Sequence, residues 1–382
     1  MTSLLVDDIG LLVSWADEQP AQRSAALVIE DGVVAWVGSA SQAPPADRRL
    51  DAGGRCVLPG FVDAHTHLVF GGDRVAEFEA RLAGTPYSAG GIRATVAATR
   101  AASTADLMAR TQALAAEALA SGTTTIEVKS GYGLTVDDER RLLEVAGSVT
   151  RHRTFLGAHV VPTGSTAADY TDLVSGPMLD AVADLATGVD VFCENGAFDV
   201  DQSRQVLTAG AERGLAVHVH ANQLRAGPGV QLAASLEAAS ADHCTHVTAG
   251  DVAALRDAGV VAVLVPAAEF GTGSPYAPGR QLLDAGVTVA LATDCNPGTS
   301  FTTSMPFVIS LACRELGLTP TEAVWAATSG GAKALRSNDI GHLRVGAQGD
   351  LVVLDAPGPA YLAYRPGVDL VHRVVRAGVV VR

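Results

Sequence analysis

The chain has 382 residues, of which 48% are hydrophobic, and it carries a formal net charge of −14. This length suits one large domain with a smaller companion, because single hydrophobic cores stop growing at roughly 250–300 residues. The acidic balance argues against nucleic acid as a partner, and no apolar run approaches the roughly 20 residues of a membrane span.

The two ends of the chain show the same pattern of short strands and turns. LLVSW, AALVIEDGVVAWVGSA and RCVLPG lie near the start, and Asp31-Gly32 is a hairpin signal within them. GDLVVLDA and HRVVRAGVVVR lie near the end, with Ala377-Gly378 at a turn. Neither end can bury a sheet face by itself. We therefore expect residues 1–57 and 341–382 to form one small β-sandwich domain that is discontinuous in sequence.

Residues 58–340 alternate strand-like and helical segments. Helical segments rich in alanine, leucine and arginine separate most of the strands, and one of them, STADLMARTQALAAEALASG, has its N-cap at Ser103 or Thr104. About eight such units predict an α/β fold, a (β/α)8 TIM barrel. A doubly wound open sheet is the alternative, because alternation does not distinguish an open sheet from a closed one. The predicted strands are LPGFVDAHTHL, TTTIEVKS, RTFLGAHVV, GVDVFCE, LAVHVHA, SADHCTHV, GVVAVLVP and VTVALATD.

The cysteines and the N-terminal segment bear on the compartment. Five cysteines at irregular spacing form neither a disulfide framework nor a CxxC pair. The first residues, MTSLLVDDIGLLVSW, lack the basic and apolar regions of a signal peptide. We therefore expect a cytoplasmic protein.

Histidine, acidic or lysine side chains end most of the predicted strands, which is where barrel enzymes place their chemistry. His65 and His67 are two residues apart in a strand, so both face one side, and neutral imidazole is the commonest metal ligand near neutral pH. An isolated HxH is more often structural, but the apolar strand LPGFVDA before it favours a metal site. The residues at these ends are His65, His67, Glu127, Lys129, His159, Glu194, His218, His220, His243 and Asp294.

Three of these strand ends leave alternatives open. His220 lies nearer the barrel mouth than His218, for which a buried, hydrogen-bonded structural role is the simpler interpretation. Asp294 can bind a metal and take a proton from water, or it can cap a helix. His243 and His246 both lie at the polar end of one strand and compete for a catalytic role.

These residues lie in motifs that resemble the amidohydrolase superfamily in order and spacing, from LPGFVDAHTHL to ATD at 292–294. Along nearly the whole chain the motifs are similar to those of the imidazolonepropionases within that superfamily. The shared segments are HLVFGGDR, GTTTIEVKSGYGL, FLGAHVVP, VHVHANQ, SADH and ATDCNPGTS. EVKSGYGL and TDCNPGTS are specific, whereas GHLRVGAQGDLVVLD recurs across the superfamily.

The resemblance implies one metal ion, zinc or iron, bound by His65, His67, His220 and Asp294. It implies that His243 and Asp294 are catalytic, and that no modified Lys129 bridges a second ion. Some members carry a glutamate in place of Gln223, and an amide cannot take a proton, which counts against a base there. CTHVTAGD departs from the family pattern, so His246 stays an alternative. The implied substrate contacts are Arg74, Tyr87, Tyr132, His159, Gln223, Asn296, Gly298 and Thr299.

The reaction implied is hydrolysis of the lactam ring of 4-imidazolone-5-propionate to N-formimidoyl-L-glutamate, a step of histidine degradation, by a metal-activated water. Arg74 is the expected cation for the propionate of this small-molecule substrate. The alternative is another cyclic amidase or ring aminohydrolase of the superfamily; a non-enzymatic barrel is disfavoured, since all four metal ligands are present. The donor set accommodates zinc, iron or manganese, and a homodimer is compatible with the sequence.

Overall fold

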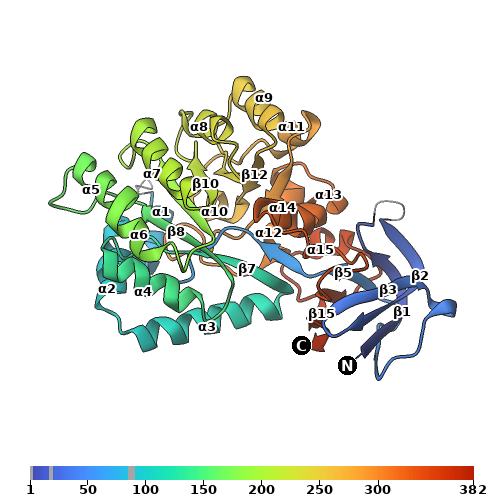
Figure 1. Ribbon diagram of the computed structural model, residues 1–382. Coiled ribbons are helices and arrows are strands. Elements are labelled where there is room, and N and C mark those ends of the chain that lie inside the picture. The colour runs from blue at the N-terminus through green and yellow to red at the C-terminus, as the bar shows by residue number, and fades with distance from the viewer. Residues whose placement is uncertain (1–2, 17–19, 85–90) are drawn as a thin grey trace.

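The computed structural model describes residues 3–16, 20–84 and 91–382, and its larger part is a sheet of eight parallel strands that follow one another in chain order (Figure 1). Nearly every residue of these strands is buried, as expected when helices cover the outside of a parallel sheet. The predicted barrel strands are all confirmed. They are β6 (Phe61–Asp63), β7 (Thr123–Lys129), β8 (His152–Ala158), β9 (Gly188–Cys193), β10 (Ala216–Ala221), β11 (Ser240–His243), β12 (Val261–Leu264) and β13 (Val289–Leu291).

The first and last strands meet just beyond their C-terminal ends. Thr66 and Cys295 form a parallel bridge, and the backbone N–H of Asp294 donates to the carbonyl of His65 at 3.0 Å. This contact closes the sheet into a barrel and decides against the open sheet. It also brings the ends of β6 and β13 together, although about 230 residues separate them in the sequence.

Helices connect the barrel strands and lie outside them (Figure 1). Ser103 is the N-cap of α3, because its side chain accepts a hydrogen bond from the backbone N–H of Asp106, and this settles the choice between Ser103 and Thr104. The helices of this part are α1 (Val75–Leu82), α2 (Ile92–Ala101), α3 (Thr104–Ala120), α4 (Val136–Ala146), α5 (Ala167–Leu173), α6 (Leu179–Val182), α7 (Val200–Glu212), α8 (Gly229–Ser235), α9 (Ala249–Ala258), α10 (Pro266–Thr272), α11 (Gly279–Asp284), α12 (Met305–Glu315), α13 (Pro320–Trp325) and α14 (Gly331–Ala334).

The second sheet combines both ends of the chain, which lie close together in Figure 1. Its pairing is mostly antiparallel, and the turns at Asp31-Gly32 and Ala377-Gly378 have the positive φ angles of tight hairpins. A helix, α15 (Ala360–Tyr364), follows β14. The strands are β1 (Ser3–Val13), β2 (Ala21–Glu30), β3 (Val33–Ser39), β4 (Arg48–Asp51), β5 (Cys56–Pro59), β14 (Leu351–Leu354), β15 (Val371–Arg376) and β16 (Val379–Val380).

The second sheet has a hydrophobic core of its own, built by Val6, Leu27, Val57 and Leu351 among others. β5 pairs with β1 and β14 and runs to Pro59, two residues past the expected limit at 57. The division at 57/58 and 340/341 stays a prediction.

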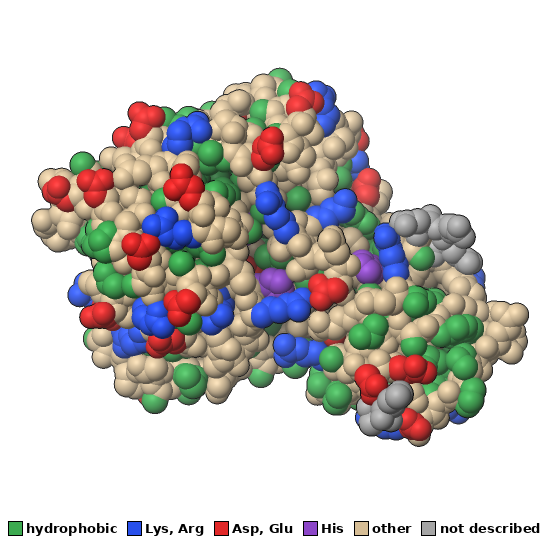
Figure 2. Space-filling view, viewed as in Figure 1, with side chains coloured by type: hydrophobic (Ala, Val, Ile, Leu, Met, Phe, Trp, Pro, Cys, Tyr) green, Lys and Arg blue, Asp and Glu red, His purple; other side chains and the backbone are tan. Residues whose placement is uncertain are grey.

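On the face seen in Figure 2, acidic and basic side chains lie over both parts of the molecule. In the described part of the chain, no helix combines the length and the apolar character required to cross a membrane.

Candidate functional site

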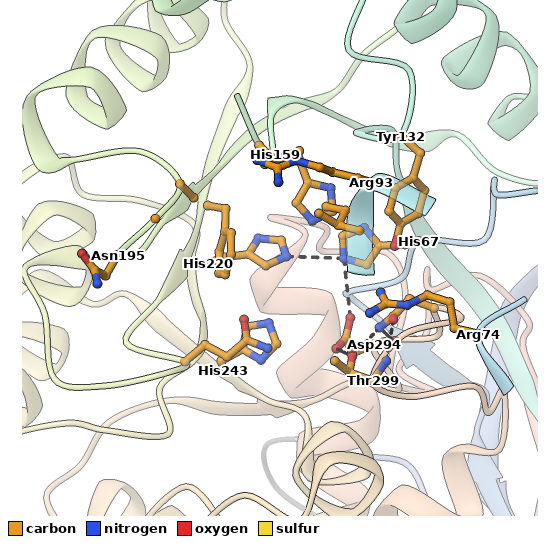
Figure 3. A pocket seen from close by; sticks show the side chains of 17 residues that line it. His67, Arg74, Arg93, Tyr132, His159, Asn195, His220, His243, Asp294 and Thr299 are labelled. Carbon is orange, nitrogen blue, oxygen red and sulfur yellow. Dashed lines mark hydrogen bonds and ion pairs between the residues drawn. The ribbon is translucent and has the colours of Figure 1, made fainter. Parts of the chain in front are cut away.

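Side chains from the ends of β6, β10 and β13 lie close together at the mouth of the barrel, and Figure 3 shows His67, His220 and Asp294 among them. His65, His67 and His220 form one group of possible metal ligands, and Asp294 forms another with His65 and His243. Asp294 Oδ1 lies 3.5 Å from His65 Nε2 and 3.5 Å from His67 Nε2, and His220 Nε2 lies 3.4 Å from His67 Nε2. Four donors around an ion at about 2.0–2.1 Å form a tetrahedron with edges of about 3.4 Å. His65 Nε2 is buried and has no hydrogen-bond partner among the described residues. These three donor–donor distances agree with the edges expected around a single metal ion.

Two buried aspartates lie beside the Nδ1 atoms of two of these histidines and orient their rings. Asp242 Oδ2 lies 2.6 Å from His65 Nδ1, and Asp190 Oδ2 lies 2.9 Å from His220 Nδ1. A proton on each Nδ1 directs the lone pair of Nε2 at the common point, as carboxylates do behind metal-binding histidines. Sequence reasoning missed both aspartates, because DVFCE and SADH read as strand interiors. An acidic residue inside a buried strand was the available signal.

Lys129 joins these aspartates in a buried charge network. Its Nζ lies 3.0 Å from Asp190, 3.1 Å from Glu127 and 3.6 Å from Asp242, and the side chain is fully buried. Burial opposes the charge, but the attraction of Asp190, Glu127 and Asp242 raises the pKa of Lys129 above its ordinary value. Lys129 thus serves as a counter-ion to three carboxylates behind the histidines.

The loop after β13 holds Asp294 in place. Asp294 has a φ of 50°, a left-handed conformation that aspartate adopts only at a cost and that clusters at functional sites. Asn296 Nδ2 donates to the carbonyl of Asp294 at 2.6 Å, and Thr299 Oγ1 donates to its Oδ2 at 3.2 Å. Burial raises the pKa of Asp294 to about 7. The next helix begins only at Met305 with Ser304 as its cap, so Asp294 does not cap a helix.

The EVKSGYGL motif begins at the end of β7 and continues as a loop, residues 130–134, that the buried carboxylate of Glu139 holds in place. Glu139 accepts hydrogen bonds of 2.8 Å from the backbone N–H groups of Gly131, Gly133 and Leu134. Tyr132 stands at the centre of this loop with its ring 5.9 Å from that of His67. Glu139 was not singled out from the sequence, and it fixes the position of a predicted substrate contact.

His159 depends on the same loop. Its Nδ1 lies 3.0 Å from the carbonyl of Gly131, so the proton sits on Nδ1 and Nε2 is left to accept. Burial lowers the pKa of His159 to about 3, which keeps the ring neutral. Gly131 has a φ of 106°, and a Cβ there would lie 2.8 Å from His159 Nδ1, so the position requires glycine.

A cavity of about 260 Å³ opens above the converging ligands (Figure 3). Phe192, Asn195 and Arg93 also line it, and none of them was singled out from the sequence. Gly298 does not line this cavity, and Tyr87 lies outside the described residues. The expected substrate contacts that do line it are Arg74, Tyr132, His159, Gln223, Asn296 and Thr299.

Arg74 reaches the cavity while paired with Glu77. Its Nε and a terminal nitrogen donate to the two carboxylate oxygens of Glu77 at 3.0 and 2.5 Å. The guanidinium also packs against Gly298, where a Cβ would lie 2.3 Å from its other terminal nitrogen. Gly298 therefore leaves room for Arg74.

His243 and His246 occupy different places. His243 lines the cavity, and its ring centroid lies 5.4 Å from that of His65 and 5.3 Å from that of His220. His246 is half-buried and does not line the cavity, and its carbonyl accepts a hydrogen bond from Asn222 Nδ2. The geometry favours His243, whose catalytic role stays a prediction. His218 Nδ1 lies 2.8 Å from Ser240 Oγ, in agreement with the structural role expected for it.

Known proteins resemble this chain over its full length. The model of the amidohydrolase family matches residues 56–381. An imidazolonepropionase of Mycolicibacterium smegmatis is 61% identical and the alignment covers 100% of this chain and 98% of that protein. An imidazolonepropionase of Salinispora arenicola is 60% identical, with 99% of each chain covered.

Solved structures share the fold at low sequence identity. An adenosine deaminase from Xanthomonas campestris with bound zinc has a TM-score of 0.74 and 22% identity, over 99% of this chain and 92% of that one. An atrazine chlorohydrolase from Arthrobacter aurescens in complex with zinc has a TM-score of 0.73 and 18% identity, over 99% and 94%. These likenesses support the barrel and its companion sheet.

Proposed function

We infer that this chain, which belongs to the amidohydrolase family and within it to the imidazolonepropionases, hydrolyses the lactam ring of 4-imidazolone-5-propionate to N-formimidoyl-L-glutamate in histidine degradation. The relatives match it along its whole length, and the chain is therefore a hydrolase. The observation that carries the proposal is that His67, His220 and Asp294 line one small cavity, with His65 Nε2 3.5 Å from Asp294 Oδ1. Its volume of about 260 Å³ suits a small substrate, near the low end of ligand pockets, which span roughly 300–1,000 Å³.

The proposal includes one metal ion, zinc or iron, held by His65, His67, His220 and Asp294. Three nitrogen donors and one carboxylate suit either metal. When bound, such an ion polarises the ring carbonyl and lowers the pKa of water from about 15.7 to about 7.

Asp294 is the proposed proton carrier. Its Oδ1 faces the imidazoles and its Oδ2 is held by Thr299, so the carboxylate is oriented toward the cavity. It takes a proton from the attacking water as the new C–O bond forms. It then gives that proton to the ring nitrogen as the C–N bond breaks, so the ring opens without net gain or loss of protons.

His243 and Gln223 support this step from the opposite wall. Burial lowers the pKa of His243 well below its ordinary value, and a neutral imidazole still has one N–H to donate to the developing oxyanion. Gln223 lines the same cavity and hydrogen-bonds the substrate, since its amide cannot accept a proton.

The direct test is incubation of the purified protein with freshly made imidazolone propionate, following the loss of ring absorbance and the appearance of formimidoyl-glutamate. We expect rapid turnover by the wild type and turnover lower by orders of magnitude by Asp294→Asn, compared per bound metal ion. Turnover of another cyclic amide or of an amino-substituted ring, with imidazolone propionate left intact, would instead support the alternative hydrolases.

The proposed compartment is the cytoplasm. All five cysteines are free thiols and four of them are buried, which suits a reducing environment.

A further inference from the structure

Glu269 is a buried acid on α10 that does not line the main cavity. The residue is 4% exposed, and its Oε1 accepts a hydrogen bond of 2.8 Å from Thr245 Oγ1. Its Oε2 is buried and makes no hydrogen bond of normal geometry to a described residue, although the backbone N–H of Ala277 lowers the pKa of the carboxyl. A buried polar atom without a full partner costs free energy, so its presence in a folded protein calls for an explanation.

Glu269 lines a second, much smaller cavity of about 20 Å³. That volume has room for one water molecule, which needs roughly 10–15 Å³. Gln223 and His243 line this small cavity and also the main cavity, so their side chains lie between the two. A water molecule in the small cavity can therefore contact Glu269 on one side and the ring of His243 on the other.

The backbone that carries His243 is held in a strained conformation. His243 has a φ of 72° and Cys244 a φ of 52°, both in the left-handed region. Such residues persist only where the surrounding structure enforces them, and they cluster at functional sites. Thr245 comes next in the chain, and its hydrogen bond to Glu269 ties this segment to α10. Glu269 thus reaches His243 in two ways, through this segment and across the small cavity.

We propose that Glu269 is a positioning residue that, through one water molecule, fixes which ring nitrogen of His243 carries the proton. This inference rests on the proposed function, in which His243 donates its N–H to the developing oxyanion. The carboxyl, with its proton on Oε2, donates to the water, and the water donates to the ring nitrogen that faces the small cavity. The single proton of the neutral imidazole then stays on the other nitrogen, which faces the main cavity and the substrate.

The protonation states of both groups support this direction of the hydrogen bonds. Burial raises the pKa of Glu269 to about 8, against the opposing effect of the Thr245 hydrogen bond, so the carboxyl is mainly protonated at pH 7. Burial lowers the pKa of His243 well below its ordinary value, so one ring nitrogen is free to accept. An ionised carboxylate would favour the reverse chain, in which His243 donates to the water and presents its lone pair to the substrate.

The test compares the wild type, Glu269→Gln and Glu269→Met on imidazolone propionate. Glutamine keeps an acceptor for Thr245 and a neutral donor beside it, so Glu269→Gln should retain kcat within about twofold. Methionine has a similar length and no donor, so Glu269→Met should lower kcat about five- to fifty-fold, with KM within about threefold. Glu315→Met is the matched control and should equal the wild type, because Glu315 is an exposed glutamate at the end of α12.

A second measurement separates positioning from a structural role. In the zinc-loaded protein, the ¹⁵N chemical shifts of the His243 imidazole report which nitrogen carries the proton. We expect one tautomer in the wild type and in Glu269→Gln, and a mixture of both in Glu269→Met. The Tm of Glu269→Met should be no lower than that of Glu315→Met, because the substitution removes an incompletely paired buried carboxyl.

Three results would overturn the assignment. They are an unchanged kcat in Glu269→Met, an equal loss in Glu269→Gln, and a loss of kcat with lowered Tm but an unchanged His243 tautomer. Failure of the wild type to consume imidazolone propionate would instead overturn the proposed function. The imidazole signals do not depend on turnover, so the two failures are distinguishable.

Discussion

Replacement of Lys129 by methionine probes the buried network behind the histidines. The substitution keeps an unbranched side chain of similar length and removes the charge. It leaves Glu127, Asp190 and Asp242 buried without the ammonium that lies 3.0–3.6 Å from them.

The magnitude follows from those distances. The attraction between Lys129 and each of the three carboxylates is about 5 kcal/mol at an effective dielectric constant of 20. The cost of removing the ammonium from water offsets a large part of the summed attraction. Breaking a buried ion pair from one side costs about 3–5 kcal/mol. At roughly 2.1 cal/mol/K per residue, that loss lowers Tm by about 5 °C for a chain of this length. Metal affinity should fall about 10- to 100-fold, because Asp242 and Asp190 orient the ligand histidines.

The loss of stability caused by Lys129→Met should also depend on pH. Burial raises the pKa of Glu127 to about 7 and that of Asp242 to about 6 even with Lys129 present, and both pKa values rise further without it. Carboxyls with folded pKa values above the unfolded values of about 4 bind more protons when folded. The metal-free variant should therefore lose stability as pH rises from about 6 to 8, relative to the wild type.

The assays are thermal unfolding of the metal-free proteins at both pH values and metal titration against a competing chelator. Lys333→Met is the matched control, because Lys333 is the only other lysine of the chain and is exposed. If Lys129→Met has the same Tm as Lys333→Met, and its metal affinity is within twofold of that control, then the network neither stabilises the fold nor orients the ligand histidines.

Four further outcomes are expected. His65→Ala should lose bound metal, measured by elemental analysis at about one ion per wild-type chain, and keep its far-UV circular dichroism; a fully active metal-free protein would contradict the site. Asp294→Asn should lower kcat by orders of magnitude, since an amide is a poor proton acceptor, and unchanged kcat would refute its role. His243→Ala should reduce kcat while retaining metal and His246→Ala should be nearly silent; the reverse pattern would reassign the catalytic histidine. Gly298→Ala should displace the guanidinium packed against it and raise KM more than it lowers kcat, and normal kinetics would show that this contact is dispensable.

Local pattern in the sequence was sufficient to predict the eight strands and their positions, but it left an open sheet as the alternative to the barrel. Strands buried on both faces have apolar sequences, and most of them end at a polar residue, so the ends that hold His65, His220 and Asp294 could be located in advance. The hairpins at both chain ends were equally readable, because Asp31-Gly32 and Ala377-Gly378 need positive φ angles that few residue pairs adopt easily.

Only the tertiary structure determines which side chains contact the ligand histidines and which hold the loop beside them. Asp190, Asp242 and Lys129 come from three different strands, and only closure of the barrel brings their charges within 3–4 Å, which no spacing in the sequence encodes. The same holds for Glu139, whose carboxylate clamps a loop through backbone N–H groups that leave no mark on residue type.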